Sequence, residues 1–160
     1  SQLVELVTKE GKSPKTEFVG KSAKYILDKI GITVGDDVKV ILMEAKEDHP
    51  FVQVELMMPI LPLVRVPDVD QAIEMAVRVE HGNRHTAMMH SRNVEKLTKM
   101  AKLIQTTIFV KNGPSYAGIG VGGEGYTTFT IAGPTGEGLT SAKSFARRRR
   151  CVLVGGMDVR

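Results

Sequence analysis

The sequence predicts an α/β fold, a mostly parallel sheet with flanking helices. Between residues 61 and 111, short β-branched or apolar runs alternate with amphipathic stretches of helical period. Short links separate them, and the order strand, helix, strand, helix, strand is typical of parallel strands joined by right-handed crossovers. Of the 160 residues, 42% are hydrophobic and 25% are charged, which is enough apolar material for a packed core.

Two helices, a loop and a strand are expected before residue 44. Residues 2–8 are predicted to form one or two helical turns, and residues 11–15 a loop. From 22 to 30 the apolar side chains recur at helical spacing, and Gly31 supplies a stop. Residues 38–43 are predicted to be a short strand.

The stretch 49–66, HPFVQVELMMPILPLVRV, places one carboxylate beside a long apolar run. Glu55 is costly to bury there unless something binds it. Pro59 and Pro62 each remove a backbone donor, so residues 55–62 are expected to lie outside a helix or a central strand. We predict a stiff loop that presents Glu55 and leads into a buried strand. The alternative is an ordinary strand entry with a solvated glutamate.

Two rounds of one pattern follow. In the first round, residues 61–66 are strand-like, and Asp68 is a good N-cap for a helix that Gly82 ends. The apolar face of this helix consists of Val69, Ala72, Ile73, Ala76 and Val77.

The second round begins with a strand at 86–90. Ser91 or Asn93 then caps a helix, and residues 107–111 close the series as a strand of β-branched and aromatic side chains. The apolar face of this helix consists of Val94, Leu97, Ala101 and Ile104.

The chain changes character after residue 111. Residues 112–125 form a long glycine-rich loop, and loops of this length in a compact domain are usually functional. Residues 126–131 are predicted to be a strand and 134–138 a turn. A short helix is expected at 140–147, capped by its first threonine, and a terminal strand at 151–154.

The glycine-rich loop matches the dinucleotide motif G-x-G-x-x-G by letter, at Gly118, Gly120 and Gly123. That mechanism needs a strand running directly into the glycines and a helix directly after them. Here the preceding strand ends several residues earlier, and a threonine-rich strand follows. We therefore reject a nucleotide-binding fingerprint and expect a loop packed closely against other backbone.

Three other groups of residues do not indicate a site. The run Arg147–Arg150 lacks interleaved aromatic residues, so a solvated helix end or a subunit contact is preferred over phosphate binding. Cys151 lies among Val and Leu and is interpreted as a small buried hydrophobe, because a nucleophile needs an electropositive, exposed setting. The four histidines show no metal-ligand spacing, since Gly82 interrupts the pair His81 and His85.

Composition excludes several classes of protein. A single cysteine rules out an intrachain disulfide and fits a reducing compartment. The longest apolar run is too short and too proline-broken to span a bilayer, and the first residues do not resemble a signal peptide. The net charge of +4 owes much to the arginine run. We expect a cytoplasmic protein with neither a membrane nor a nucleic-acid partner.

Several long motifs, in order, resemble the aldehyde dehydrogenase family. Glu55-Leu56-Met57-Met58-Pro59 resembles its Glu-x-Phe-Gly-Pro motif, with two methionines in place of Phe and Gly. The stretch 49–66, RHTAMMHS, TTIFVKNGPSYAG and FTIAGPTGEGLTSAKSFARRRRCVL together resemble the CoA-acylating branch, in particular the propionaldehyde and acetaldehyde dehydrogenases of bacterial microcompartments. The resemblance covers roughly residues 15 to 155.

The resemblance implies cofactor and catalytic residues. The carboxylate that matches Glu55 would hydrogen-bond the nicotinamide ribose of NAD, and Met57 would flank the nicotinamide ring. The histidine that matches His85 would act as a base near the thioester. By position alone, His85 is a surface or hydrogen-bonded histidine at a strand start, near the edge opposite the usual ligand-binding end.

The resemblance also implies a substrate side and a division of the chain. The loop after residue 111 would border the aldehyde pocket, which makes Asn112, Ser115 and Tyr116 substrate-binding candidates. Residues 1–146 would be the later half of a catalytic domain, and 147–160 a C-terminal oligomerisation strand and tail. Because family members are longer, the nucleophilic cysteine and the nucleotide-binding domain are expected outside this chain, which alone would be inactive.

Three functions stay open at this point. The first is part of an oxidoreductase that converts a short-chain aldehyde, NAD and CoA to acyl-CoA and NADH. It would be a homo-oligomer in the cytoplasm or inside a bacterial microcompartment, with shell or core enzymes as partners. The second is a non-catalytic assembly or regulatory module with the same fold. The third is a nucleic-acid-binding domain that uses the arginine run, and it predicts a steep salt dependence of DNA binding.

Overall fold

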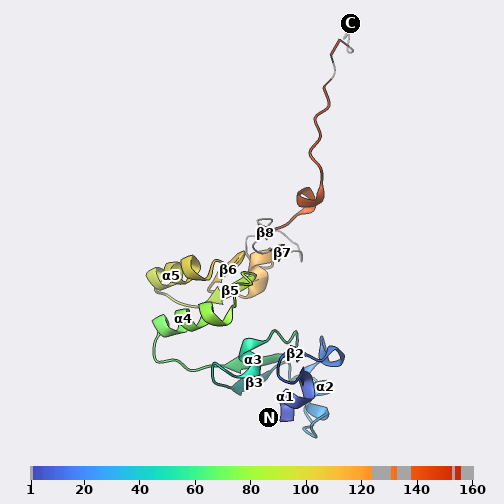
Figure 1. Ribbon diagram of the computed structural model, residues 1–160, viewed down its shortest axis with the longest axis vertical. Helices are drawn as coiled ribbons and strands as arrows, with labels where there is room; N and C mark the ends of the chain where they lie inside the picture. Colours follow the sequence, from blue (N-terminus) through green and yellow to red (C-terminus); the bar gives the residue numbers. More distant parts are fainter. Residues whose placement is uncertain (1, 124–130, 133–137, 153, 156–160) are drawn as a thin grey trace. The chain divides into compact units, whose positions relative to one another are not determined.

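The computed structural model describes residues 2–123, 131–132, 138–152 and 154–155. The chain forms two compact units, Ser1–Val79 and Glu80–Arg160 (Figure 1). Each unit contains one pair of parallel strands whose connection includes a helix. The predicted α/β class with parallel strands is therefore confirmed, whereas the division at residue 147 stays a prediction.

Unit 1 begins with short elements. In order these are α1 (Gln2–Val7), β1 (Thr8–Lys9), β2 (Ser13–Pro14), the 3-10 helix η1 (Thr16–Phe18) and α2 (Ala23–Asp28). The helices expected at 2–8 and 22–30 are confirmed, and Ser22 Oγ caps the second by accepting from Tyr25 N at 3.2 Å. The loop expected at 11–15 is wrong in part. Strand β2 pairs antiparallel with β1, because Gly11 at φ +70° allows a tight reversal between them.

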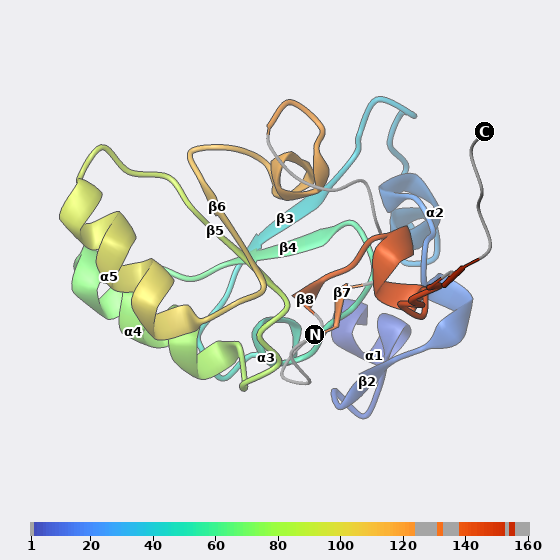
Figure 2. The same cartoon turned by 90° about the horizontal axis from the view of Figure 1, so that it is seen from above.

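The parallel pair of unit 1 consists of β3 (Ile41–Glu44) and β4 (Ile60–Leu63), with α3 (Pro50–Gln53) between them in the chain (Figure 2). The register places Ile41 beside Ile60 and Glu44 beside Leu63. Strand β3 is shorter than the predicted span 38–43 and begins later. Strand β4 is shorter than the predicted span 61–66 and begins one residue earlier.

Pro62 lies inside β4, so the loop predicted over residues 55–62 ends before Ile60. The expectation that these residues avoid a central strand holds, because β4 has one partner among the described strands. Ile41 N and Ala45 N donate to the carbonyls of Pro59 and Leu63, at 2.8 and 2.9 Å. Alternate residues of β4 therefore face β3, and the nitrogen of Pro62 points to the other side. In the described part of the chain β4 pairs only with β3, so the missing donor breaks no ladder bond.

The core of unit 1 gathers side chains from four helices, the loop after α3 and β4. Its buried members are Val7, Phe18, Ile26, Phe51, Leu56 and Ile60. The predicted helix after Asp68 is α4 (Val69–Val79), and Asp68 Oδ1 accepts from Gln71 N at 2.9 Å. Ile73 is its buried residue, whereas Val69, expected on the same face, is exposed at the first helical position.

Unit 2 is built on β5 (Thr86–Met89), α5 (Val94–Ile104) and β6 (Ile108–Lys111). The strands are parallel, with Thr86 beside Ile108 and Met89 beside Lys111 (Figure 2). Of the two proposed caps, Asn93 is the one used. The buried face of α5 consists of Leu97, Met100 and Ile104, so the expected stripe is correct except for Val94, which is exposed, and Ala101, which is half-buried.

The rest of unit 2 contains the 3-10 helix η2 (Ser115–Ile119), the antiparallel pair β7 (Ile131–Ala132) and β8 (Gly138–Leu139), and the 3-10 helix η3 (Ala142–Phe145). Most of the strand predicted at 126–131 and of the turn at 134–138 lies outside the described residues.

Two predictions near the C-terminus need correction. The short helix expected at 140–147 is confirmed in part, as the 3-10 helix η3, but its N-cap is Ser141 rather than Thr140. The Ser141 N–H donates to Ser144 Oγ at 3.1 Å, and Thr140 is buried. The strand expected at 151–154 is not formed by the residues described there, since no described strand pairs with them. Cys151 is accordingly exposed rather than buried.

Candidate functional site

The loop between α3 and β4 presents Glu55 as predicted. Leu56 anchors the loop in the core of unit 1, and Glu55 immediately before it is exposed. Gly20 N donates to the carbonyl of Met57 at 3.1 Å, and Ile60 N donates to that of Met58 at 2.8 Å. The loop is therefore held on both sides of Met57, which has φ 55° and a side chain that is 64% exposed.

The Glu55 carboxylate is open to a ligand. Among the described residues, no hydrogen bond or ion pair engages it. An ionised carboxylate is a stronger acceptor than a neutral group, so hydroxyl or amide donors of a bound molecule could use both of its oxygens. This arrangement fits the role that the resemblance implies for Glu55.

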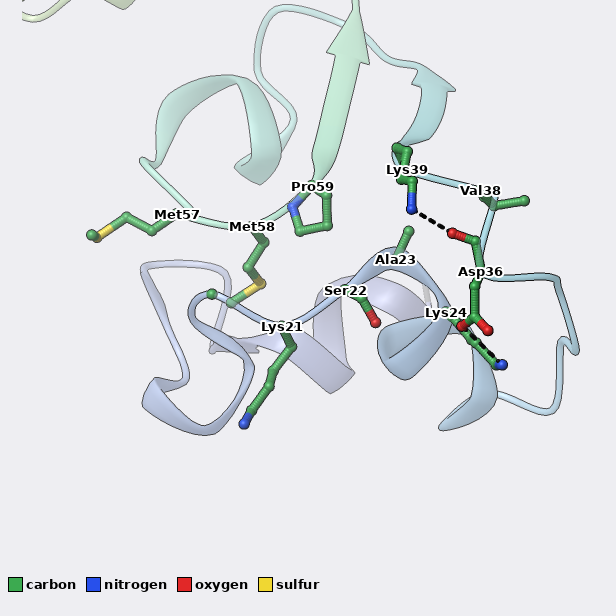
Figure 3. Close-up of a pocket in the computed structure, with 11 residues that line it drawn as sticks. Lys21, Ser22, Ala23, Lys24, Asp36, Val38, Lys39, Met57, Met58 and Pro59 are labelled. Atoms are coloured by element: carbon green, nitrogen blue, oxygen red, sulfur yellow. Dashed lines mark hydrogen bonds and ion pairs between the residues drawn. The ribbon is translucent and has the colours of Figure 1, made fainter.

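A pocket of about 540 Å³ lies beside this loop (Figure 3). Its walls are the start of α2 and the segment before β3, and Met57, Met58 and Pro59 line it as well. Lys24 Nζ pairs with Asp36 Oδ1 at 3.0 Å, and Lys39 Nζ donates to the Asp36 carbonyl at 2.6 Å. Sequence reasoning missed this pocket, because its walls come from three segments that no local spacing connects.

A second feature is the carboxyl-terminal edge of the β5–β6 pair. Asn112 directly follows β6, and its N–H donates to the carbonyl of Met89 at 3.0 Å. Its side-chain Oδ1 accepts from Ser91 N at 2.7 Å, and its Nδ2 donates to the Ser91 carbonyl at 2.9 Å. Ser115 and Tyr116 open η2 on the same side, and Tyr116 is 61% exposed. The three substrate-side candidates therefore lie together.

The glycine-rich segment of this edge is closely packed, as predicted. A Cβ on Gly118 would collide with Ile108 Cγ2, and one on Gly123 would lie 2.9 Å from the carbonyl oxygen of Ala117. These two glycines are needed because η2 lies directly on β6 and the chain then folds back over η2. The packing explains the glycines without a nucleotide.

His85 lies at the other end of the same strand pair. It is exposed, its Nδ1 is 2.7 Å from Thr86 Oγ1, and its carbonyl accepts from Ile108 N at 3.1 Å. Along β6 the position beside His85 is five residues before Asn112, which corresponds to roughly 16 Å. Within unit 2 the structure thus separates His85 from the substrate-side candidates. Glu55 and Met57 belong to unit 1.

The ion pair between Glu47 and Arg78 shifts the pKa of both side chains. The Glu47 carboxylate accepts from Arg78 Nε at 2.9 Å and from Nη2 at 3.1 Å. This fork-shaped contact lowers the pKa of Glu47 and raises that of Arg78. The hydrogen bonds are the largest cause, desolvation opposes them, and the charge attraction adds to them. The pair ties α4 to the turn before α3 and therefore has a structural role.

Neither a membrane helix nor a metal cluster is found in the described ranges. No helix there is long and apolar enough to cross a bilayer. No three side chains of His, Cys, Asp or Glu gather there in a way that could hold a metal ion.

Comparison with known proteins gives consistent matches. The model of the aldehyde dehydrogenase family matches residues 38–137, more than half of the chain. Propanal dehydrogenase (CoA-propanoylating) from Salmonella typhimurium is 54% identical over 152 residues, which are 94% of this chain and 32% of that protein. The chain therefore spans about a third of the length of this relative.

Three solved structures share the fold. A Rhodopseudomonas palustris propionaldehyde dehydrogenase with bound CoA and an acylated cysteine is 72% identical, with a TM-score of 0.89 over 95% of this chain and 35% of that one. An engineered glycolyl-CoA reductase with bound NADP+ is also 72% identical, with a TM-score of 0.88 over 95% and 34%. A propionaldehyde dehydrogenase from the fucose utilisation microcompartment of Clostridium phytofermentans is 49% identical, with a TM-score of 0.86 over 99% and 36%. The sequence match and the shared fold agree: the chain belongs to the aldehyde dehydrogenase family.

Proposed function

We propose that the protein containing this chain is a CoA-acylating, NAD-dependent aldehyde dehydrogenase that converts a short-chain aldehyde to acyl-CoA. One observation carries the proposal: 72% identity, over 95% of the chain, to a propionaldehyde dehydrogenase that has CoA bound and a cysteine acylated. The non-catalytic module is not favoured, because the similar proteins are named as enzymes.

The chain would contribute binding groups and a base, and the nucleophile would come from elsewhere in the protein. Cys151 is the only cysteine in the sequence, and it is exposed in the C-terminal segment. When bound, NAD would accept the hydride and CoA would accept the acyl group from the cysteine thioester.

Glu55 and Met57 would bind the dinucleotide. The exposed carboxylate of Glu55 suits the paired hydroxyls of a ribose, and the exposed thioether of Met57 suits the face of a nicotinamide ring. A solved relative binds NADP+, so the preference between NAD and NADP is part of the test below.

His85 would act as the base for acyl transfer. When Nδ1 carries the hydrogen, it donates to Thr86 Oγ1, and Nε2 is left as a proton acceptor. A CoA thiol is mostly protonated near neutral pH, and its thiolate is the reactive form. An exposed imidazole is suited to removing that proton.

The aldehyde would be bordered by the carboxyl-terminal edge of the β5–β6 pair. Ser115 offers a hydroxyl and Tyr116 an exposed ring, both from the 3-10 turn η2. Ligands of α/β folds commonly bind beyond this edge of parallel strands.

A homo-oligomeric state and packaging in a bacterial microcompartment are also part of the proposal. Support for packaging is the 49% identical relative from a microcompartment. Support for the oligomer is the C-terminal segment, where Val152 and Val154 are 70% and 89% exposed. Such side chains are suited to burial against another copy or a shell protein.

The experiment is an assay of the purified full-length protein with propionaldehyde. Dinucleotide reduction is followed with NAD or NADP, each with and without CoA, and acyl-CoA is quantified in the same samples. Formation of NADH and acyl-CoA in equal amounts supports the proposal. Sustained reduction that ignores CoA would contradict the acylating assignment, and no reduction by a folded protein would favour the non-catalytic module.

A further inference from the structure

Asn112 makes three hydrogen bonds, one to Met89 at the end of β5 and two to Ser91 just after that strand. Its backbone N–H extends the strand ladder to Met89, and its side-chain amide engages both the N–H and the carbonyl of Ser91. These bonds use one donor and one acceptor of the amide in a paired, planar contact. An amide engaged in this way is directed at the neighbouring backbone rather than at a substrate.

The paired contact between the Asn112 amide and the Ser91 main chain, called the clamp below, joins the segment that leads into α5 to the segment that opens η2. Ser91 leads into α5, because its Oγ accepts from the N–H of the N-cap Asn93 at 3.0 Å. On the other side, Asn112 is followed by the turn that opens η2. Asn112 adopts φ 56°, a left-handed conformation that asparagine tolerates better than most residues. The clamp therefore sets the direction in which the chain leaves β6.

The turn after Asn112 exposes one face and buries the other. Ile119 is buried, and Gly118 is pressed against Ile108, so η2 lies flat on β6. Tyr116 is left exposed on the turn, and Ser115 is half-buried beside it. A shift at Asn112 would move both side chains, because only Gly113 and Pro114 separate them from it.

We propose that Asn112 is a positioning residue for the aldehyde side of the site: its amide clamps the Ser91 main chain and thereby orients Ser115 and Tyr116. This inference rests on the proposed function. It replaces the direct substrate contact expected for Asn112 with an action through the two residues that follow.

The test uses Asn112→Gly and Asn112→Asp in the full-length protein. Glycine accepts the positive φ, so it removes the amide without adding backbone strain. Aspartate keeps the acceptor for Ser91 N but replaces the donor to the Ser91 carbonyl by an oxygen, so it should rescue only part of the effect. Ser91→Ala is the matched control, because it removes the hydroxyl and leaves both clamp bonds.

Two readouts are measured on each variant. Hydrogen exchange, followed by mass spectrometry of the peptide containing Ser91, reports whether the clamp is open. Steady-state kinetics report KM for the aldehyde, the dinucleotide and CoA separately. For Asn112→Gly we expect faster exchange at Ser91 and a roughly ten-fold lower kcat/KM for the aldehyde, the factor for one hydrogen bond at the upper end of the usual net range. The KM values for the dinucleotide and CoA should not change.

The outcomes separate the possible readings. Faster exchange with unchanged aldehyde kinetics would show that the clamp is only structural and would overturn the proposal. A higher aldehyde KM with unchanged exchange would also overturn it, in favour of direct contact. If the wild-type protein does not oxidise aldehydes with CoA at all, the proposed function fails and the positioning role fails with it. In that case the exchange data alone show whether the clamp exists.

Discussion

Replacing Glu55 by glutamine gives the sharpest test of the dinucleotide site. Glu55 is exposed, and no described residue bonds its carboxylate, so the substitution removes no hydrogen bond or ion pair to the described residues. The expected change in the free energy of unfolding is therefore within about 0.5 kcal/mol, as for most surface substitutions. A carboxylate that accepts hydrogen bonds from a ligand contributes about 1.5–3 kcal/mol, which is roughly a 10- to 150-fold change in affinity.

The assay measures KM for NAD and for propionaldehyde in full-length Glu55→Gln, together with the melting temperature. Glu10→Gln is the control, because Glu10 is an exposed carboxylate of the same unit. Its side chain is 84% exposed, and its ion pair with Lys12 Nζ, at 3.5 Å, is a solvent-exposed one that contributes little. We expect the loss to fall on NAD and to leave the aldehyde KM and the melting temperature nearly unchanged. If Glu55→Gln behaves like Glu10→Gln, the ribose assignment is wrong. If both KM values change together with the melting temperature, the loop has a structural role.

The remaining predictions concern the base, the nucleophile and one ion pair. His85→Ala in the full-length protein should lower CoA-dependent turnover by roughly 10²–10⁴-fold and keep a stoichiometric NADH burst, and a lost burst would move His85 to the first half-reaction. The 160-residue chain alone should form no NADH from propionaldehyde, NAD and CoA, and sustained formation that survives Cys151→Ala would refute a nucleophile outside this chain. Glu47→Gln should be less stable than the wild type at neutral pH. Because Arg78 lowers the pKa of Glu47, that stabilisation is present above the ordinary glutamate pKa and is lost as the pH falls through the lowered value. The melting temperatures of the two proteins should therefore converge below about pH 4, and a constant gap would show that charge is not the cause.

Local patterns determined much of the secondary structure. The helix starts after Asp68 and Asn93 were predictable because each cap accepts from a backbone N–H only three residues further on. The helix that Ser22 caps was predictable from its apolar spacing and from Gly31 instead. The parallel pairing of β5 with β6 followed from the short links around α5, which leave a crossover as the simplest connection. The exposed Glu55 was also predictable, because an unpartnered carboxylate is costly to bury.

Tertiary structure alone decided how the candidate residues are grouped. The pocket beside Met57 joins three distant segments, and the Asn112 clamp joins residues 21 positions apart, so no local spacing reveals either. His85 and Asn112 flank the same strand pair, yet the length of the strands holds them apart at opposite edges. The predicted terminal strand failed for the same reason. A strand is stabilised by hydrogen bonds to a partner, and the sequence of one segment does not state whether a partner lies beside it.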